Sequence, residues 1–224
     1  MRKWVISLGG SKIIQKDVDW YFLEAFKELI INSKDKFVIV TGGGTTARKY
    51  IRALKKLDKK EKSQSKVGIA ITRFHASFLT RIFGKKASKK IPKNMKKIAG
   101  LLRKNQIVIC GALRWKARQT SDSTAARIAA YLDCKFINMT DVKGLYTSDP
   151  DKNKNAKLIK KISWKKFYDL AKKRKYQAGQ HFILDQGAAK IILKEKIPTY
   201  ITNSLKQVKN ILSNKQFNGT LIKD

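Results

Sequence analysis

The hydrophobic positions of the chain fall into two alternating kinds of segment. Short apolar runs, typical of strands buried in a sheet, occur at residues 4–8, 37–41, 107–110, 135–139 and 198–202. Between them, apolar residues recur every three or four positions, which predicts helices near residues 18–32, 46–58, 68–83, 93–104, 122–132, 164–175, 186–195 and 204–212. Such alternation predicts an α/β fold, with a three-layer αβα sandwich around a central, mostly parallel sheet.

Polar segments divide these elements. Residues 55–66 and 85–94 are charged and lack helical periodicity, so we expect both to be flexible connections. Residues 149–153 are rich in turn formers and separate a larger N-terminal part from a smaller C-terminal part. No internal repeat is present. We expect a single domain over 1–224, with one lobe at about 1–134 and a second at about 135–224.

Composition excludes several classes of protein. The chain of 224 residues is 42% hydrophobic, which is enough for a sizeable core. No apolar run reaches about 18 residues, so we expect no membrane span, and the N-terminus lacks the long apolar region of a signal peptide. These features favour a cytoplasmic protein. Cys110 and Cys134 each border an apolar strand-like segment and are expected to be small buried hydrophobes.

The charge is extreme: 51 Lys and Arg residues against 16 Asp and Glu residues give +35. This balance favours anionic partners and nonspecific binding of polyanions. Lysine outnumbers arginine about four to one, although specific readout of phosphates or bases tends to use arginine forks. The charge therefore indicates either a solvated lysine-rich surface or a surface that handles nucleotides or nucleic acid, and both readings can hold together.

Two glycine-rich turns carry the clearest chemical signal. Gly42-Gly43-Gly44 lies between the strand 37–41 and a helix that opens at Thr45, and Gly9-Gly10 follows the strand 4–8. Glycine lets backbone N–H groups approach a ligand closely, and the partial positive charge of a helix N-terminus suits a phosphate. Two such turns early in one chain predict two anionic groups held close together.

Other phosphate and catalytic motifs are missing from the sequence. The string Gly42-x-Gly44-x-x-Ala47 fits the dinucleotide pattern formally, but the neighbourhood about 20 residues on is not the acidic end of a strand. There is no P-loop, no protein-kinase string and no paired-histidine spacing for a metal. His75 and His181 stand alone, and each is expected to be structural or on the surface.

Two strand ends carry further candidate residues. After the third strand come Gly111 and Ala112, then a cationic loop with Arg114, Lys116 and Arg118 that is able to fold over a phosphate. Thr120 or Ser121 is expected to cap the following helix, with Asp122 on its dipole. The fourth strand ends at Thr140 and Asp141, on the ligand-binding edge of a parallel sheet. Beyond it, Tyr146 is placed to lie against a purine, and Asp149 to accept from a ribose or base donor.

Taken in order, these strings resemble the amino-acid kinase superfamily and, within it, the archaeal-type uridylate (UMP) kinases. The resembling segments span nearly the whole chain, and the string Thr140–Pro150 is the most specific of them. The others are Ser7–Ser11, Thr41–Gly44 with Ala47–Ile51, Gly68–Arg73, Thr120–Asp122, Ala178–Ile192 and Asn218–Thr220.

The resemblance implies transfer of the γ-phosphoryl group of ATP, with Mg²⁺, to UMP, the smaller lobe serving ATP and the larger lobe the acceptor. It implies ATP-binding roles for Gly9, Gly10, Gly44, Arg48, Thr140, Asp141, Tyr146 and Asp149. It implies a UMP site at Gly43, Ser65, Gly111, Ala112, Arg114 and Thr120. Catalytic roles would fall to Lys12, Arg48 and Asp185, although Asp185 is equally placed to cap the helix 186–195. No metal-ligating side chains are expected, and a homohexamer is expected by analogy.

The chain departs from the family pattern at several positions. Ser7 stands where most members have a lysine, which makes Lys12 the nearest candidate substitute. Ser65 stands where the family has an acidic residue for the UMP ribose, the 112–119 loop is longer and more cationic, and Lys143 replaces an aspartate. Two alternatives follow: a kinase of the same fold for another acceptor such as isopentenyl phosphate, or a noncatalytic nucleotide- or RNA-binding protein.

Overall fold

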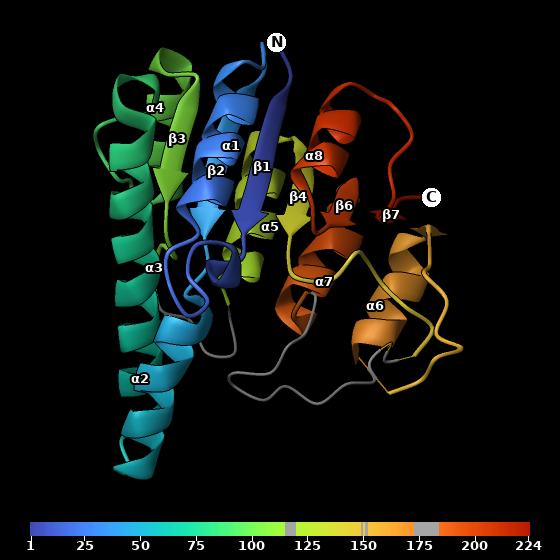
Figure 1. Ribbon diagram of the computed structural model, residues 1–224, viewed down its shortest axis with the longest axis horizontal. Coiled ribbons are helices and arrows are strands. Elements are labelled where there is room, and N and C mark those ends of the chain that lie inside the picture. The colour runs from blue at the N-terminus through green and yellow to red at the C-terminus, as the bar shows by residue number, and fades with distance from the viewer. Residues whose placement is uncertain (115–119, 149, 151, 173–183) are drawn as a thin grey trace.

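The five predicted strands all form, and they pair in one sheet of the computed structural model (Figure 1). The structure describes residues 1–224 except 115–119, 149, 151 and 173–183. Within that part the sheet has the strand order β3-β2-β1-β4-β6-β7-β5. The strands are β1 (Lys3–Leu8), β2 (Lys36–Thr41), β3 (Ile107–Cys110), β4 (Lys135–Met139), β5 (Lys161–Ile162), β6 (Thr199–Thr202) and β7 (Thr220–Ile222).

The predicted parallel sheet is confirmed, with one exception. Strands β3, β2, β1, β4 and β6 pair in parallel, but β7 runs antiparallel to β6. The sequence did not predict β5 or β7, since two or three residues are too few to show an alternating pattern. The same sheet crosses both predicted lobes, and the assignment of a nucleotide to each lobe stays a prediction.

Helices cover both faces of the sheet, which confirms the three-layer sandwich. Helices α1, α3 and α8 pack on one face, and α4, α5, α6 and α7 pack on the other. Two short 3-10 helices, η1 (Gly10–Lys12) and η2 (Gly84–Lys86), complete the described elements. The α-helices are α1 (Trp20–Ile31), α2 (Gly44–Lys56), α3 (Glu61–Phe83), α4 (Met95–Lys104), α5 (Ser121–Leu132), α6 (Trp164–Lys172), α7 (Gln186–Lys194) and α8 (Leu205–Leu212).

Each central strand feeds two cores, because successive side chains of a strand point to opposite faces. In β1, Trp4, Ile6 and Leu8 belong to the core beneath α1, α3 and α8, while Val5 belongs to the core beneath α5 and α7. All four side chains are buried. By the same alternation Ser7 faces α5, which places a hydroxyl group where the pattern would allow another apolar residue.

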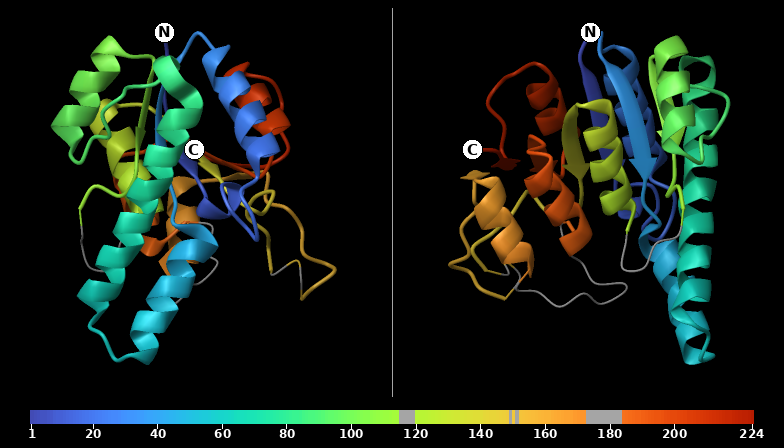
Figure 2. Two further views of the ribbon diagram at one scale, coloured as in Figure 1. Left: turned by 60° about the vertical axis from the view of Figure 1, so that its left-hand side comes forward. Right: turned by 180° about the vertical axis from the view of Figure 1, so that it is seen from behind.

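The expected flexible connection at residues 55–66 is wrong. Helix α2 continues to Lys56 and α3 begins at Glu61, so only residues 57–60 join them. The two helices pack as an antiparallel hairpin that extends past the carboxyl edge of the sheet (Figures 1 and 2). The charged sequence of residues 55–66 shows no clear helical periodicity, so packing between the two helices must supply their stability. Gly68 of α3, for example, lies against Ile51 of α2.

Candidate functional site

The two glycine turns are in direct contact at the carboxyl edge of the sheet. Strands β1 and β2 are parallel neighbours, with Leu8 beside Thr41, so the turns that follow them meet. A Cβ added at Gly10 would lie 2.2 Å from the amide nitrogen of Gly44, so only glycine fits there. Gly44 itself has φ +57°, a left-handed conformation that favours glycine. The two turns therefore lie close enough to hold neighbouring anionic groups, whose binding there stays a prediction.

Backbone donors are concentrated at this contact. Gly44 opens helix α2, and no side chain caps that helix at Gly43. The hydroxyl group of Thr45 instead donates to the carbonyl groups of Ile14 and Gln15, which ties the start of α2 to the chain beyond the first turn. An uncapped helix N-terminus leaves N–H groups and a partial positive charge available for an anion. The geometry suits a phosphate group lying over both turns.

Of the two predicted catalytic cations, Lys12 meets a predicted ATP-site residue. Lys12 Nζ lies 3.9 Å from Asp141 Oδ1, because η1 follows β1 and Asp141 follows the neighbouring strand β4. The same ammonium group lies 5.9 Å from the centre of the Phe22 ring. Arg48, one turn into α2, is half-buried and forms no hydrogen bond or ion pair within the described residues. Both cations therefore lie on elements that begin at the glycine turns.

The predicted acceptor segment is held by α3. Ala112 N donates to Thr72 Oγ1 at 2.9 Å, and Arg73 donates to the carbonyl oxygens of Ala112 and Leu113. A Cβ at Gly111 would lie 2.6 Å from Arg73 N, which explains the glycine. These two α3 residues were not among the predicted site residues. The signal that pointed to them was the Gly68–Arg73 string, whose contact with the segment depends on tertiary packing.

Two further buried groups brace the second glycine turn. His75 Nδ1 lies 2.8 Å from the carbonyl oxygen of Gly42, and the ring is buried. Thr41 Oγ1 donates to the carbonyl oxygen of Thr72 at 2.7 Å. The structural interpretation of His75 is thus confirmed, and the other histidine, His181, lies outside the described residues.

Ser7, which stands where the family resemblance leads one to expect a lysine, forms a hydrogen bond with Asp122. Its Oγ donates to Asp122 Oδ1 at 2.7 Å. Burial raises the pKa of Asp122 to about 7, and the negative charge of Asp185 adds to the rise, while the Ser7 hydrogen bond opposes it. Thr120, not Ser121, caps α5 through a bond from the Asp122 amide. The carboxylate of Asp122 therefore faces β1 as well as lying in the first turn of α5.

Asp185 joins the starts of two helices. It caps α7 by accepting from Ala188 N at 2.9 Å, which confirms the capping interpretation. The same carboxylate accepts from Ser123 Oγ at 2.6 Å and from the Thr120 hydroxyl group of α5. Its contacts in the described residues are thus to N-terminal groups of α5 and α7. Its negative charge also opposes the lowering of the pKa of Arg127, an α5 residue that was not among the predicted site residues.

The string Thr140–Pro150, predicted to serve ATP, is anchored at its start and near its middle. Thr140 N donates to the carbonyl oxygen of Thr202, and Thr220 Oγ1 accepts from Leu145 N at 2.8 Å. Tyr146 forms a bridge with Leu158 and is half-buried. Asp149, predicted to bind ATP, lies outside the described residues, as do Lys116 and Arg118. The string therefore follows β4 along the same edge as the glycine turns.

Ser65 and Arg114 complete the predicted acceptor set. Ser65 lies in α3, one turn before Gly68, whose carbonyl oxygen would be 3.7 Å from a Cβ on Gly43. Arg114 is exposed, and its charge lowers the pKa of Arg127 after the larger effect of burial. Within the part of the chain that the structure describes, the buried Arg127 Nε has no hydrogen-bond partner. These guanidinium groups add positive charge beside α5.

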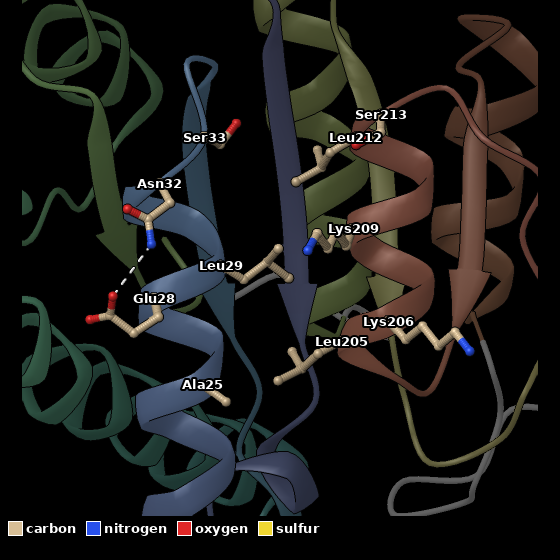
Figure 3. A pocket seen from close by; sticks show the side chains of 10 residues that line it. All are labelled: Ala25, Glu28, Leu29, Asn32, Ser33, Leu205, Lys206, Lys209, Leu212 and Ser213. Atoms are coloured by element: carbon tan, nitrogen blue, oxygen red, sulfur yellow. Dashed lines mark hydrogen bonds between the residues drawn. The ribbon is translucent and has the colours of Figure 1, made fainter.

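The structure also has a groove that lies away from the glycine turns and the other predicted site residues. A cavity of about 500 Å³ lies between α1 and α8 and is lined by residues such as Leu29, Leu205 and Lys209 (Figure 3). None of the predicted site residues lines it. Among the described residues, no cluster of three or more His, Cys, Asp or Glu side chains is placed to hold a metal ion, and no helix is long and apolar enough to span a bilayer.

Comparisons with known proteins agree with this architecture. Residues 2–203 match the Amino acid kinase family. The chain is 36% identical to the uridylate kinase of Thermococcus kodakarensis over 200 residues, which cover 88% of each chain. It resembles the crystal structure of the uridylate kinase from Archaeoglobus fulgidus with a TM-score of 0.86 and 29% identity, over 99% of this chain and 100% of that one.

A more distant likeness concerns the fold alone. The structure of an isopentenyl phosphate kinase matches with a TM-score of 0.72 and 19% identity, over 99% of this chain and 100% of that one. The family match covers most of the chain, and the contact between the glycine turns gives it a structural basis. The chain therefore belongs to the amino acid kinase family.

Proposed function

We propose that this protein phosphorylates UMP to UDP with ATP, as a nucleoside monophosphate kinase of the cytoplasm that serves pyrimidine nucleotide synthesis. The observation that carries the proposal is the contact between Gly10 and Gly44, which brings together two glycine turns suited to phosphate groups. Similarity to uridylate kinases of archaea supports the choice of UMP. ATP would lie toward β4 and its loop, and UMP toward α3 and the 111–114 segment.

The reaction needs little covalent chemistry from the protein. In-line transfer of a phosphoryl group depends on positioning of the two oxygen atoms and on neutralising the charge between them. The uncapped N-terminus of α2 would bind phosphate oxygens, while Lys12 and Arg48 would neutralise negative charge. Arg73 would act indirectly, because its side chain holds the backbone of the proposed acceptor segment in place and does not itself bind the substrate.

We propose that Mg²⁺ enters with ATP. The proposed site offers Lys12 and the backbone N–H groups at the start of α2, which suit the phosphate groups of ATP. Phosphate oxygens and water are the ordinary ligands of Mg²⁺ in such reactions. When bound, the ion would supply further neutralisation of phosphate charge. Asp141, paired with Lys12, is the donor-side carboxylate available to orient its water shell.

An acceptor screen tests the proposal. ADP release would be measured with ATP and Mg²⁺ against UMP, CMP, dUMP and isopentenyl phosphate. We expect kcat/KM to be highest for UMP by at least about tenfold. Equal or greater activity with isopentenyl phosphate would mean that UMP is not the preferred acceptor. This outcome is included because Ser65 stands where the family has an acidic residue for the UMP ribose. No turnover with any acceptor would favour the noncatalytic alternative.

We propose in addition that the protein is a homo-oligomer, with a hexamer as the expected form. Its support is an apolar stripe on α3, where Phe74 is 67% exposed and Val67, Ile71 and Phe78 are partly buried one or two turns away. Such a stripe is typical of a helix face that packs against a partner. Light scattering would give a mass several times that of one 25.6 kDa chain, and Phe74→Asp would lower it. An unchanged mass for Phe74→Asp would assign the contact to another surface.

A further inference from the structure

Acidic residues are distributed unevenly along the sequence. Between Glu61 and Asp122 the sequence has no acidic residue, whereas it has sixteen Lys and Arg residues. Nine of these fall within twenty consecutive positions. We call these nine side chains the cationic band: Lys85, Lys86, Lys89, Lys90, Lys93, Lys96, Lys97, Arg103 and Lys104.

The band lies on one edge of the molecule, away from the glycine turns. It runs from η2 through residues 87–94 to α4, beside the edge strand β3 (Figure 1). Ala87 forms a bridge with Ile107, the first residue of β3, which fixes the segment near the amino end of that strand. The glycine turns follow the carboxyl ends of β1 and β2. A partner on the band would therefore leave the proposed nucleotide site open.

The charge of the band is not compensated within the described part of the chain. All nine side chains are exposed, and none of them forms a hydrogen bond or an ion pair there. Cations elsewhere do find acidic partners, as Arg2 does with Asp35 and Lys165 with Asp169. Like charges held this close raise the local potential and attract anions, most strongly anions that carry many charges in a row.

The packing of α4 and the composition of the cationic band indicate which class of anionic partner it would bind. Helix α4 buries Ile98 and Leu102 against the protein core, so it presents no apolar face for insertion into a bilayer. The band contains eight lysines and one arginine, which favours contacts to charge over bidentate reading of bases. A regular series of phosphates matches these properties. We propose that the cationic band binds the phosphodiester backbone of nucleic acid without sequence preference.

Fluorescence anisotropy with a labelled 30-base-pair RNA duplex tests this proposal. Its bases are paired and cannot enter the nucleotide site, so binding reports on the backbone alone. The variant Lys89→Gln/Lys90→Gln/Lys93→Gln/Lys97→Gln should bind at least tenfold more weakly than the unmodified protein at 100 mM salt. The slope of log affinity against log salt should fall by about 3 to 4, since each duplex phosphate contact contributes about 0.9. A DNA duplex of equal length should behave alike.

A matched control removes the same charge from other helices. The variant Lys190→Gln/Lys206→Gln/Lys209→Gln/Lys215→Gln changes four exposed lysines on or just after α7 and α8. It should bind the duplex within about threefold of the unmodified protein. Equal weakening by both variants would mean that net charge alone attracts RNA, and unchanged binding by the band variant would exclude the band; either result overturns the proposal.

Two further measurements keep the outcome clear. Both variants should keep the melting temperature and the acceptor kinetics of the unmodified protein, which separates a binding defect from misfolding. Vesicles of phosphatidylserine and phosphatidylcholine should bind more weakly than the duplex at the same salt. Tighter band-dependent binding to vesicles would assign the surface to membranes and reject nucleic acid. The proposal is independent of the acceptor, so failure of the UMP assignment would leave it standing.

Discussion

Ser7 donates a hydrogen bond to Asp122 across 115 residues of sequence, with 2.7 Å between the two oxygen atoms. The contact forms because Ser7 points from β1 toward the first turn of α5. No ion pair of Asp122 with a lysine or arginine is found in the described part of the chain, and Asp185 is a second negative charge nearby. A neutral hydroxyl group thus partners a carboxyl group whose pKa is raised to about 7.

The titration of Asp122 should be visible in the stability of the protein. A carboxyl group with a raised folded pKa binds its proton more tightly in the folded state, so stability falls as pH rises from about 4 to about 7. Asp122→Asn removes this loss. Urea unfolding should show the variant gaining on the order of 2 kcal/mol over the unmodified protein between pH 5 and pH 8.

Asp133→Asn is the control for that measurement, because Asp133 is an exposed acidic residue at the other end of the same helix. It should follow the unmodified protein at every pH. Parallel stability curves for Asp122→Asn and the unmodified protein would show that Asp122 keeps an ordinary pKa.

Gly10→Ala should damage the junction of the two turns. An added Cβ would lie 2.2 Å from Gly44 N and 2.6 Å from Gly43 C, both backbone atoms that cannot turn aside. We expect kcat/KM for UMP to fall by at least about 100-fold, because displacement of about 1 Å in a phosphoryl-transfer site has that effect. Gly100→Ala meets no atom within 4 Å and should add about 0.5 kcal/mol of stability with unchanged kinetics. Similar kinetics for both variants would contradict the role of the contact.

Substitution of Arg73 should change the KM for UMP and leave the KM for ATP nearly unchanged. Its guanidinium group holds the carbonyl oxygens of Ala112 and Leu113, at the segment proposed for UMP. Arg73→Met should raise the KM for UMP roughly tenfold, with the KM for ATP within about twofold, since a charged hydrogen bond contributes about 1.5–3 kcal/mol. Arg81→Met is the control, because among the described residues the Arg81 side chain bonds only to Ser77 of its own helix. A larger rise in the KM for ATP would move the acceptor to another surface.

Asp185 should contribute more to stability than an ordinary helix cap. Asp185→Ala removes the α7 cap and the bonds to Ser123 and Thr120, so the free energy of unfolding should fall by on the order of 3 kcal/mol. Asp19→Ala, which removes the single capping bond of α1, should lower it by about 1 kcal/mol. Equal losses in denaturant unfolding would mean that the link from Asp185 to α5 adds nothing.

Local patterns in the sequence were sufficient for most of the elements, while the ligand that they indicated stays a prediction. Apolar runs and three-to-four spacing indicated five strands and the helices, because burial on a sheet or along one helix face imposes those periods. Glycine at positions 9, 10 and 42–44 indicated turns with little steric hindrance, and in the structure Gly10 and Gly44 lie so close that a Cβ at Gly10 would clash with Gly44. These features depend on neighbours in the chain, so the sequence carries them directly.

Tertiary structure alone decided which distant groups meet. Ser7 with Asp122, Arg73 with the carbonyl groups of residues 112–113, and Asp185 with Ser123 are contacts between elements far apart in sequence. Helix α3 extends back to Glu61 because it packs on α2, and β7 joins the sheet as an antiparallel strand although its three residues show no period. Periodicity records which face of an element is buried, but not the element against which that face packs, and the site is assembled from those pairings.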